Sequence, residues 1–135
     1  MNYKLLKERD TLNGPGLRVV LVSCYGDSDS CKPFTEDTLT EIVAELDSID
    51  DYNGFTFSGD DPLSDINYKT VRDISRTLRA IFGNSKSIWI YTSRSIQSVL
   101  ELNTPDMKEL LDYIDVIVNG KQLYDCKTKM ISCNL

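Results

Sequence analysis

Apolar residues in this 135-residue chain recur in two patterns, short continuous runs and helical repeats. Four short runs rich in β-branched residues predict buried strands over residues 17–22, 55–58, 87–92 and 115–118. Between them, apolar residues three and four positions apart predict helices over residues 35–49, 67–82, 95–102 and from 104 onward. This alternation favours right-handed crossovers, and it predicts an α/β fold with a parallel sheet.

The ends of the predicted helices carry recognisable signals. Thr35 or Thr38 can cap the first helix, and Gly83 follows the last apolar residue of the second. Pro105 stands where a helix begins, a position at which its missing amide hydrogen costs nothing. We expect one domain over residues 1–135, with a loosely specified tail from about residue 121.

Composition narrows the possible chemistry. A net charge of −6 argues against direct nucleic-acid or membrane binding and favours basic protein partners. The absence of histidine excludes Ser-His-Asp hydrolysis and His-liganded zinc. The first residues lack the apolar core of a secretion signal, and no segment approaches a membrane span, so we expect a cytoplasmic protein with reduced thiols.

Ligands of parallel α/β sheets bind beyond the carboxyl ends of the strands. The segments that follow the first three predicted strands are 23–31, 58–63 and 92–95. We therefore expect any functional site to be built from these three segments.

The same segments carry a resemblance to a known family. The turn and strand over residues 13–20 (NGPGLRVV), the turn over 57–63 (FSGDDPL), the strand over 89–92 (WIYT) and the segment 115–120 (DVIVNG) occur in a characteristic order. In these motifs the chain resembles the activating proteins of anaerobic ribonucleotide reductase, which are small radical S-adenosylmethionine (SAM) enzymes. The resemblance implies a partial (β/α) barrel of the radical-SAM activase type.

In that family a Cys-x3-Cys-x2-Cys loop holds a four-iron, four-sulfur cluster, which binds SAM and generates the radical that is passed to a glycine of the reductase. By resemblance, Cys24 and Cys31 match the first and third cysteines, whereas Ser28 stands at the middle position. A serine hydroxyl is a poor substitute for a thiolate on iron. The resemblance therefore implies a vestigial cluster loop, with Cys24 and Cys31 retaining at most a labile metal site.

The family's SAM-binding turn usually reads Gly-Gly-Glu-Pro or Gly-Gly-Asp-Pro. Here it reads Gly59-Asp60-Asp61-Pro62, so that Asp60 adds a charged side chain where the second glycine allows close contact. Asp61 keeps the acidic position. The resemblance thus marks Gly59, Asp60 and Asp61 as vestigial cofactor-binding positions, and we expect no catalytic residue, no cofactor and no metal.

Other interpretations of these residues remain open. Cys24 and Cys31 can be two reduced cysteines at the end of a core strand, or form a zinc site with Cys126 and Cys133. Asp60 and Asp61 can be solvated, or hold Mg²⁺ with Asp27 or Asp29. Three arginines on the second helix can form a solvated face or a ridge for an acidic partner: Arg72, Arg76 and Arg79. Trp89 suits the core.

Three functions compete. The first is a non-catalytic relative of the activase, a regulator or inhibitor that binds the glycyl-radical reductase, an active paralogue or, for a viral chain, a host or defence protein. The second is an active radical-SAM activating enzyme with atypical ligation by Cys24 and Cys31, assisted by Ser28, Asp27 or a tail cysteine, which needs the [4Fe-4S] cluster and SAM. The third is a SAM- or nucleoside-binding module under Thr92 and Val118, or an acidic inhibitor of a nucleic-acid-binding protein.

Overall fold

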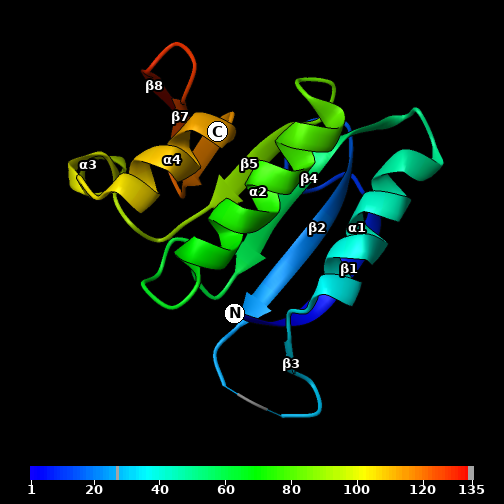
Figure 1. The fold of residues 1–135 in the computed structure, drawn as a ribbon. Coiled ribbons are helices and arrows are strands. Elements are labelled where there is room, and N and C mark those ends of the chain that lie inside the picture. Colours follow the sequence, from blue (N-terminus) through cyan, green and yellow to red (C-terminus); the bar gives the residue numbers. More distant parts are fainter. Residues whose placement is uncertain (27, 134–135) are drawn as a thin grey trace.

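A computed structural model describes residues 1–26 and 28–133, in which eight strands form one sheet with helices packed on it (Figure 1). The strands are β1 (Asn2–Asp10), β2 (Leu17–Cys24), β3 (Lys32–Pro33), β4 (Tyr52–Gly59), β5 (Ser87–Tyr91), β6 (Val116–Asn119), β7 (Gln122–Asp125) and β8 (Met130–Cys133). The helices are α1 (Glu36–Ser48), α2 (Tyr68–Phe82), α3 (Ile96–Glu101) and α4 (Pro105–Tyr113).

The order across the sheet is β3-β1-β2-β4-β5-β6-β7-β8. The four strands predicted from apolar runs, β2, β4, β5 and β6, lie together and pair in parallel, as expected. The strands outside them pair antiparallel, so the fold is a mixed α/β sheet rather than a wholly parallel one.

The antiparallel strands come from segments that lack a strong apolar pattern. β1 has no buried residue and carries charged side chains, and only its first two residues pair with the short strand β3 on its outer side. The segment from Lys121 onward, where the sequence suggests a loosely specified tail, forms the β7–β8 hairpin, and all four residues of β8 are exposed. Without a buried face, such strands leave little hydrophobic periodicity to detect.

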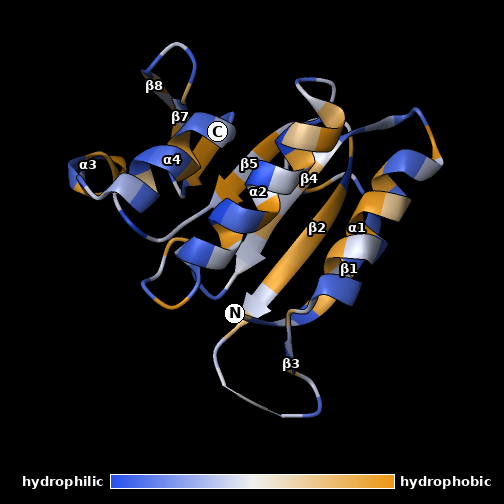
Figure 2. Ribbon diagram, viewed as in Figure 1, coloured by the Kyte–Doolittle hydropathy of each residue, from blue (hydrophilic) through white to orange (hydrophobic). Residues whose placement is uncertain are grey.

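The core lies between the central strands and the helices. Side chains such as Val19, Leu21, Phe55, Phe57 and Ile90 are almost fully buried there. Figure 2 shows apolar colouring along β2 and β5, and polar stretches along the helices. No helix in the described part of the chain combines the length and apolar character that a membrane span requires.

The helix-end signals hold in the structure. Thr35 caps α1 and its side chain accepts from the Thr38 amide, while Pro105 opens α4 behind the cap residue Thr104. Gly83 ends α2 with a positive φ of 59°. The helix positions, and with them the connections to the sheet, are therefore encoded locally.

Arg18 lies fully buried at the amino-terminal edge of the parallel strands, away from the strand ends described below. Its guanidinium donates to Thr56 Oγ1 at 2.8 Å and to Ser87 O at 2.8 Å, and it lies 5.7 Å from the centre of the half-buried Trp89 ring. Burial lowers the pKa of Arg18 to about 10. Arg18 therefore ties three strands together at one edge of the sheet.

The arginines of α2 do not form the solvated or docking ridge that the sequence allows. Arg72 and Arg76 pair with Asp106 and Glu109 of α4. Arg79 pairs with Asp115, next to β6. Arg72 and Arg79 are largely buried and Arg76 is half exposed, and all three join α2 to its neighbours.

Candidate functional site

The carboxyl ends of β2, β4 and β5 meet at one edge of the sheet, as parallel pairing requires. Ser23 and Gly59 are register partners, and the Asp60 amide donates to Ser23 O at 3.0 Å. The Ser23 hydroxyl is within hydrogen-bond reach of the carbonyls of Ser58 and Asp60. Two of the three predicted segments are thus joined through their backbones.

Gly59 allows this close approach. Its φ is +92°, and a Cβ there would collide with the backbone of Ser23. A glycine is needed at this position for both reasons.

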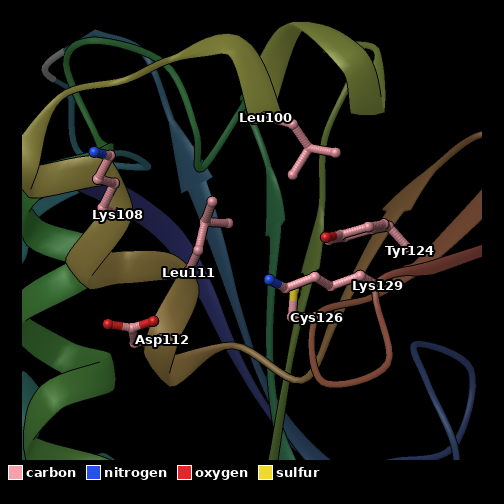
Figure 3. A pocket seen from close by; sticks show the side chains of 7 residues that line it. All are labelled: Leu100, Lys108, Leu111, Asp112, Tyr124, Cys126 and Lys129. Atoms are coloured by element: carbon pink, nitrogen blue, oxygen red, sulfur yellow. The ribbon is translucent and has the colours of Figure 1, made fainter.

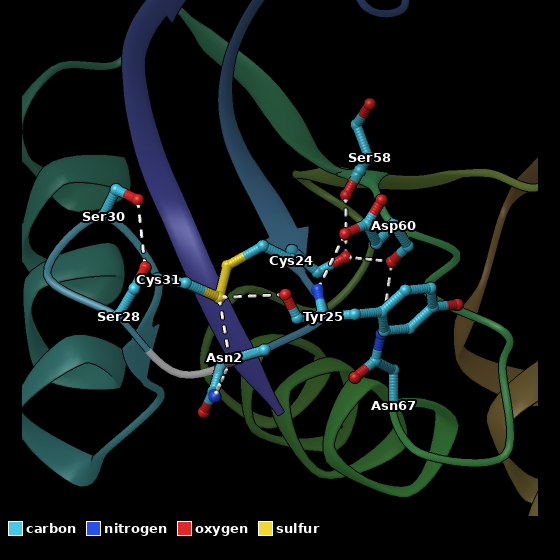
Figure 4. Close-up of a disulfide and its surroundings, with 11 residues drawn as sticks. Asn2, Cys24, Tyr25, Ser28, Ser30, Cys31, Ser58, Asp60 and Asn67 are labelled. Carbon is cyan, nitrogen blue, oxygen red and sulfur yellow. Dashed lines mark hydrogen bonds between the residues drawn. A yellow bond between two sulfur atoms is a disulfide. The ribbon is translucent and has the colours of Figure 1, made fainter.

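Asp60 holds the loop that follows β2. Its carboxylate accepts from the Tyr25 amide at 2.7 Å (Figure 4). Buried Asn67 donates to the carbonyls of Asp60 and Asp61 at 3.2 and 3.1 Å, which fixes the shape of the turn. The added carboxylate therefore anchors the cysteine-containing loop.

Asp61 links the β4 and β5 ends. Its carboxylate accepts from the Thr92 hydroxyl at 2.9 Å, from the Ser93 amide and hydroxyl at 3.1 and 2.8 Å, and from the Leu63 amide at 2.9 Å. Burial alone would raise the pKa of Asp61, but these hydrogen bonds outweigh it and hold the pKa below its ordinary value. Asp61 is therefore a charged, fully engaged acceptor.

Cys24 and Cys31 are joined in a disulfide, with their Cα atoms 6.1 Å apart. Their interpretation as two reduced cysteines is therefore wrong for this structure: the loop turns back, so that residues seven apart meet. Both cysteines are buried, and Asn2 of β1 donates to Gly26 O at 2.6 Å across the loop. The resemblance matched the two residues that the fold brings together.

Ser28 does not turn toward the sulfur atoms. Its backbone pairs with Cys31 in an isolated bridge, and its exposed hydroxyl lies 3.1 Å from that of Ser30. In Figure 4 the hydroxyl points to Ser30 and away from the disulfide. The middle ligand position thus offers a hydroxyl that is engaged elsewhere.

The remaining cysteines cannot supply the missing thiolate. Cys126 directly follows β7 and Cys133 ends β8, and β7 lies four strands away from β2 in the sheet. At about 4.8 Å per strand, that separation is roughly 19 Å. The described residues therefore do not fit a cluster held by three thiolates, and the four-cysteine zinc site is not formed.

A magnesium site at the acidic turn is not supported either. Among the described residues, no group of three or more His, Cys, Asp or Glu side chains is placed to hold a metal ion. Asp60 and Asp61 are occupied by amide and hydroxyl donors, as described above. Asp27 lies outside the described residues, so its role as a ligand stays untested.

At Thr92 and Val118, where the sequence suggests a nucleoside pocket, the described residues are closely packed. Both residues are buried, and the Thr92 amide donates to Val118 O at 2.8 Å. A pocket of about 460 Å³ lies instead between α3, α4 and the β7–β8 hairpin (Figure 3). It is lined by Leu100, Lys108, Leu111, Asp112, Tyr124, Cys126 and Lys129.

Sequence reasoning missed three polar residues of this edge, namely Ser23, Asn67 and Ser93. Ser23 and Ser93 lie within the strand-end segments, so their position was available as a signal. Asn67 was expected only as the beginning of a helix, because nothing in its neighbourhood indicates that its amide reaches back to the turn.

Comparison with known proteins places these features in a family. A family model described as a 4Fe-4S single cluster domain matches residues 12–134. The chain is 31% identical to the anaerobic ribonucleoside-triphosphate reductase-activating protein of Enterobacteria phage T4, over 97% of this chain and 87% of the relative. It is 28% identical to the protein of the same name from Haemophilus influenzae, over 90% of this chain and 84% of the relative. No solved structure matches.

The expectation that the chain has no cofactor is contradicted by these matches, because the family is described by its four-iron, four-sulfur cluster. The sequence argument failed because it inferred the absence of the cofactor from a few departures from the family pattern, chiefly Ser28 and Asp60. The loop, the acidic turn and the relatives together show that this chain belongs to the family of 4Fe-4S single-cluster domains that includes the activating proteins of anaerobic ribonucleoside-triphosphate reductase.

Proposed function

We propose that the chain binds an anaerobic ribonucleotide reductase as a diverged relative of its activating protein, and that its role there is regulatory rather than catalytic. The reductase is proposed as the partner because the relatives are named as its activating proteins. The mixed sheet is compatible with the partial (β/α) barrel of radical-SAM activases, which we include in the proposal.

One observation carries the regulatory part. The loop offers two sulfur atoms, from Cys24 and Cys31, and a hydroxyl from Ser28 that points to Ser30. Fe–S clusters are normally held by thiolates, and a hydroxyl is a hard ligand. Cys24 and Cys31 remain the residues that would hold the family's cluster, which supplies one-electron reduction when bound.

The acidic turn supports the same proposal. We assign Gly59, Asp60 and Asp61 to the family's SAM-binding turn. The Asp60 carboxylate is bound to the Tyr25 amide, and the Asp61 carboxylate to Thr92 and Ser93. These bonds join the turn to the cysteine loop and to the end of β5.

The test compares three chains after reduction of the disulfide and anaerobic reconstitution with iron and sulfide. The wild type, Ser28→Cys and the matched control Ser30→Cys are assayed for iron and sulfide content, and for 5′-deoxyadenosine after addition of dithionite and SAM. We expect Ser28→Cys, which restores the Cys-x3-Cys-x2-Cys spacing, to hold several-fold more cluster than the other two. Binding of the wild type to the reductase is measured in parallel by sedimentation.

Two results would contradict the proposal. A wild type that forms 5′-deoxyadenosine and the glycyl radical as fast as Ser28→Cys would show that the role is catalytic. If the wild type does not bind the reductase, the proposed partner is wrong.

The second candidate is an active radical-SAM activating enzyme with atypical ligation by Cys24, Cys31 and Ser28. The extent of the similarity favours it, since the alignment with the phage protein covers 97% of this chain. The same comparison decides between the two, because only this candidate predicts catalysis by the wild type.

A further inference from the structure

The face formed by α1 and α2 has a hollowed, partly apolar surface. One pocket of about 330 Å³ is lined by Glu36, Leu39, Thr40, Val43, Ala44, Thr77 and Ile81. A second, of about 430 Å³, shares Glu36, Leu39 and Thr77 with it. The two pockets therefore form a continuous groove between the helices, which lie side by side in Figure 1.

Apolar side chains of this groove remain in contact with solvent. Ile81 of α2 is 52% exposed, Ala44 of α1 is exposed, and Leu39 and Val43 are only half-buried. On α1, residues 36, 40, 43 and 47 follow the spacing of three to four that places side chains on one helix face. The groove thus offers an apolar floor with room for side chains from another molecule.

The charge along α1 and the turn that follows it is one-sided. Seven of the chain's 21 acidic residues and none of its 15 basic residues fall within residues 36–51. In the described part of the chain, no Lys or Arg forms an ion pair with any of these seven carboxylates. Six of the seven are exposed: Glu36, Asp37, Glu41, Asp47, Asp50 and Asp51.

The basic residues of α2 do not neutralise this rim. Arg72 and Arg76 bind Asp106 and Glu109 of α4, and Arg79 binds Asp115. α2 contributes Thr70, Thr77 and Ile81 to the two pockets, together with Asp73. The groove is therefore apolar at its floor and acidic along α1.

We propose that this groove docks a basic amphipathic helix of the partner protein, with apolar residues between α1 and α2 and Lys or Arg residues against the acidic side of α1. Helices commonly bind in grooves through apolar residues three and four positions apart. Uncompensated acidic groups at the rim favour a basic segment and disfavour an acidic one. This inference rests on the proposed function, because it takes the partner to be the anaerobic reductase.

Binding to the immobilised reductase is measured for two groove variants and two matched controls. Ile81→Ser removes an exposed apolar side chain from the groove, and Leu100→Ser removes one that is 43% exposed on α3. Asp47→Lys reverses a charge on α1, and Glu8→Lys reverses an exposed one on β1. We expect each groove variant to weaken binding about tenfold and each control less than about twofold.

We expect the groove substitutions to leave the protein folded. Ile81 is more than half exposed, so its loss leaves the core intact. Asp47 lies in the last turn of α1, which has no basic residue, and a lysine there interacts favourably with the helix dipole. Melting temperatures of all four variants are measured to verify that each is folded.

The outcomes separate the two proposals. If the wild type does not bind the reductase, the proposed function fails and this inference fails with it. If the wild type binds and the groove variants bind equally well, only this inference is overturned.

A photo-crosslinking amino acid at position 40, within the groove, identifies the occupant. Crosslinks to a Lys- and Arg-rich helical segment of the reductase support the proposal. Crosslinks only to an acidic or extended segment contradict it.

Discussion

At the scale of single residues, two neighbouring aspartates in one turn have different roles. Asp60 binds the Tyr25 amide and anchors the loop after β2, whereas Asp61 binds Thr92 and Ser93 at the end of β5. The pattern Gly-Asp-Asp-Pro identifies the turn but does not distinguish these roles, because each depends on which strand end lies opposite.

Asp61→Asn should destabilise the fold by about 1–3 kcal/mol, because an amide can accept hydrogen bonds through only one atom and leaves buried donors unpaired. The exposed Asp65→Asn, which removes a surface ion pair at 3.3 Å, is the control and should cost under about 1 kcal/mol. Urea unfolding at pH 7 measures both. Equal stability of the two variants would contradict the structural role given to Asp61.

Asp61 should also contribute to acid sensitivity. Its pKa is lower in the folded chain than the unfolded value of about 3.9. Its contribution is therefore present above that value and is lost as pH falls through the folded pKa. Unfolding measured from pH 6 to pH 2 should show a smaller loss of stability for Asp61→Asn than for the wild type below about pH 4.

The free thiols should differ in reactivity. Burial, followed by the nearby charges of Asp125 and Asp115, raises the pKa of Cys126 to about 12, whereas Cys133 is exposed. At pH 8 only about one Cys126 in 10⁴ is a thiolate, the form that reacts. Titration of the oxidised, folded protein with a disulfide reagent should therefore detect Cys133 quickly and Cys126 much more slowly. Rapid reaction of Cys126 in the folded chain would contradict its raised pKa.

At the scale of elements, the chain's own local signals place most helices and strands. Thr35 and Pro105 mark helix starts, and the apolar runs mark the four parallel strands. β1 and the β7–β8 hairpin lack such signals because they are paired at the outside of the sheet and remain largely exposed. Their pairing depends on neighbours that are distant in sequence.

Two arginines of α2 should contribute very differently to stability. Arg79 and Asp115 are only 14% and 11% exposed, whereas Arg76 and Glu109 are 49% and 34% exposed. Arg79→Ala leaves a buried carboxylate with fewer partners and should cost about 3 kcal/mol. Arg76→Ala should cost less than about 1 kcal/mol. Similar losses in urea unfolding would show that burial does not control the strength of these ion pairs.

At the scale of the whole molecule, the net charge of −6 is unevenly distributed, since residues 36–51 contain seven acidic and no basic residues. The arginines that could offset this charge from α2 are directed toward α4 and β6. The acidic face therefore persists in the folded protein and gives it a side suited to basic partners.

Association with the reductase should depend on salt. At 0.5 M salt, exposed charges are screened over shorter distances than at 0.05 M, so the association rate should fall about tenfold. Asp47→Lys should reduce this salt dependence, whereas Glu8→Lys should leave it nearly unchanged. A rate that is independent of salt would argue against electrostatic attraction by the α1 face.

The sequence by itself determined the features that depend on neighbouring residues. These are the apolar runs of the parallel strands, the caps of the helices, and the motifs that carry the family resemblance. Each follows from local geometry or from the side chains that a segment must bury.

Only the tertiary structure decided which distant groups meet. It joined Cys24 to Cys31, turned Ser28 toward Ser30, and placed the tail cysteines four and five strands away from β2. It also paired the α2 arginines with carboxylates of α4 and Asp115 and left α1 acidic beside an apolar groove. Such contacts are set by the packing of the sheet and helices as a whole, and no local pattern in the chain encodes them.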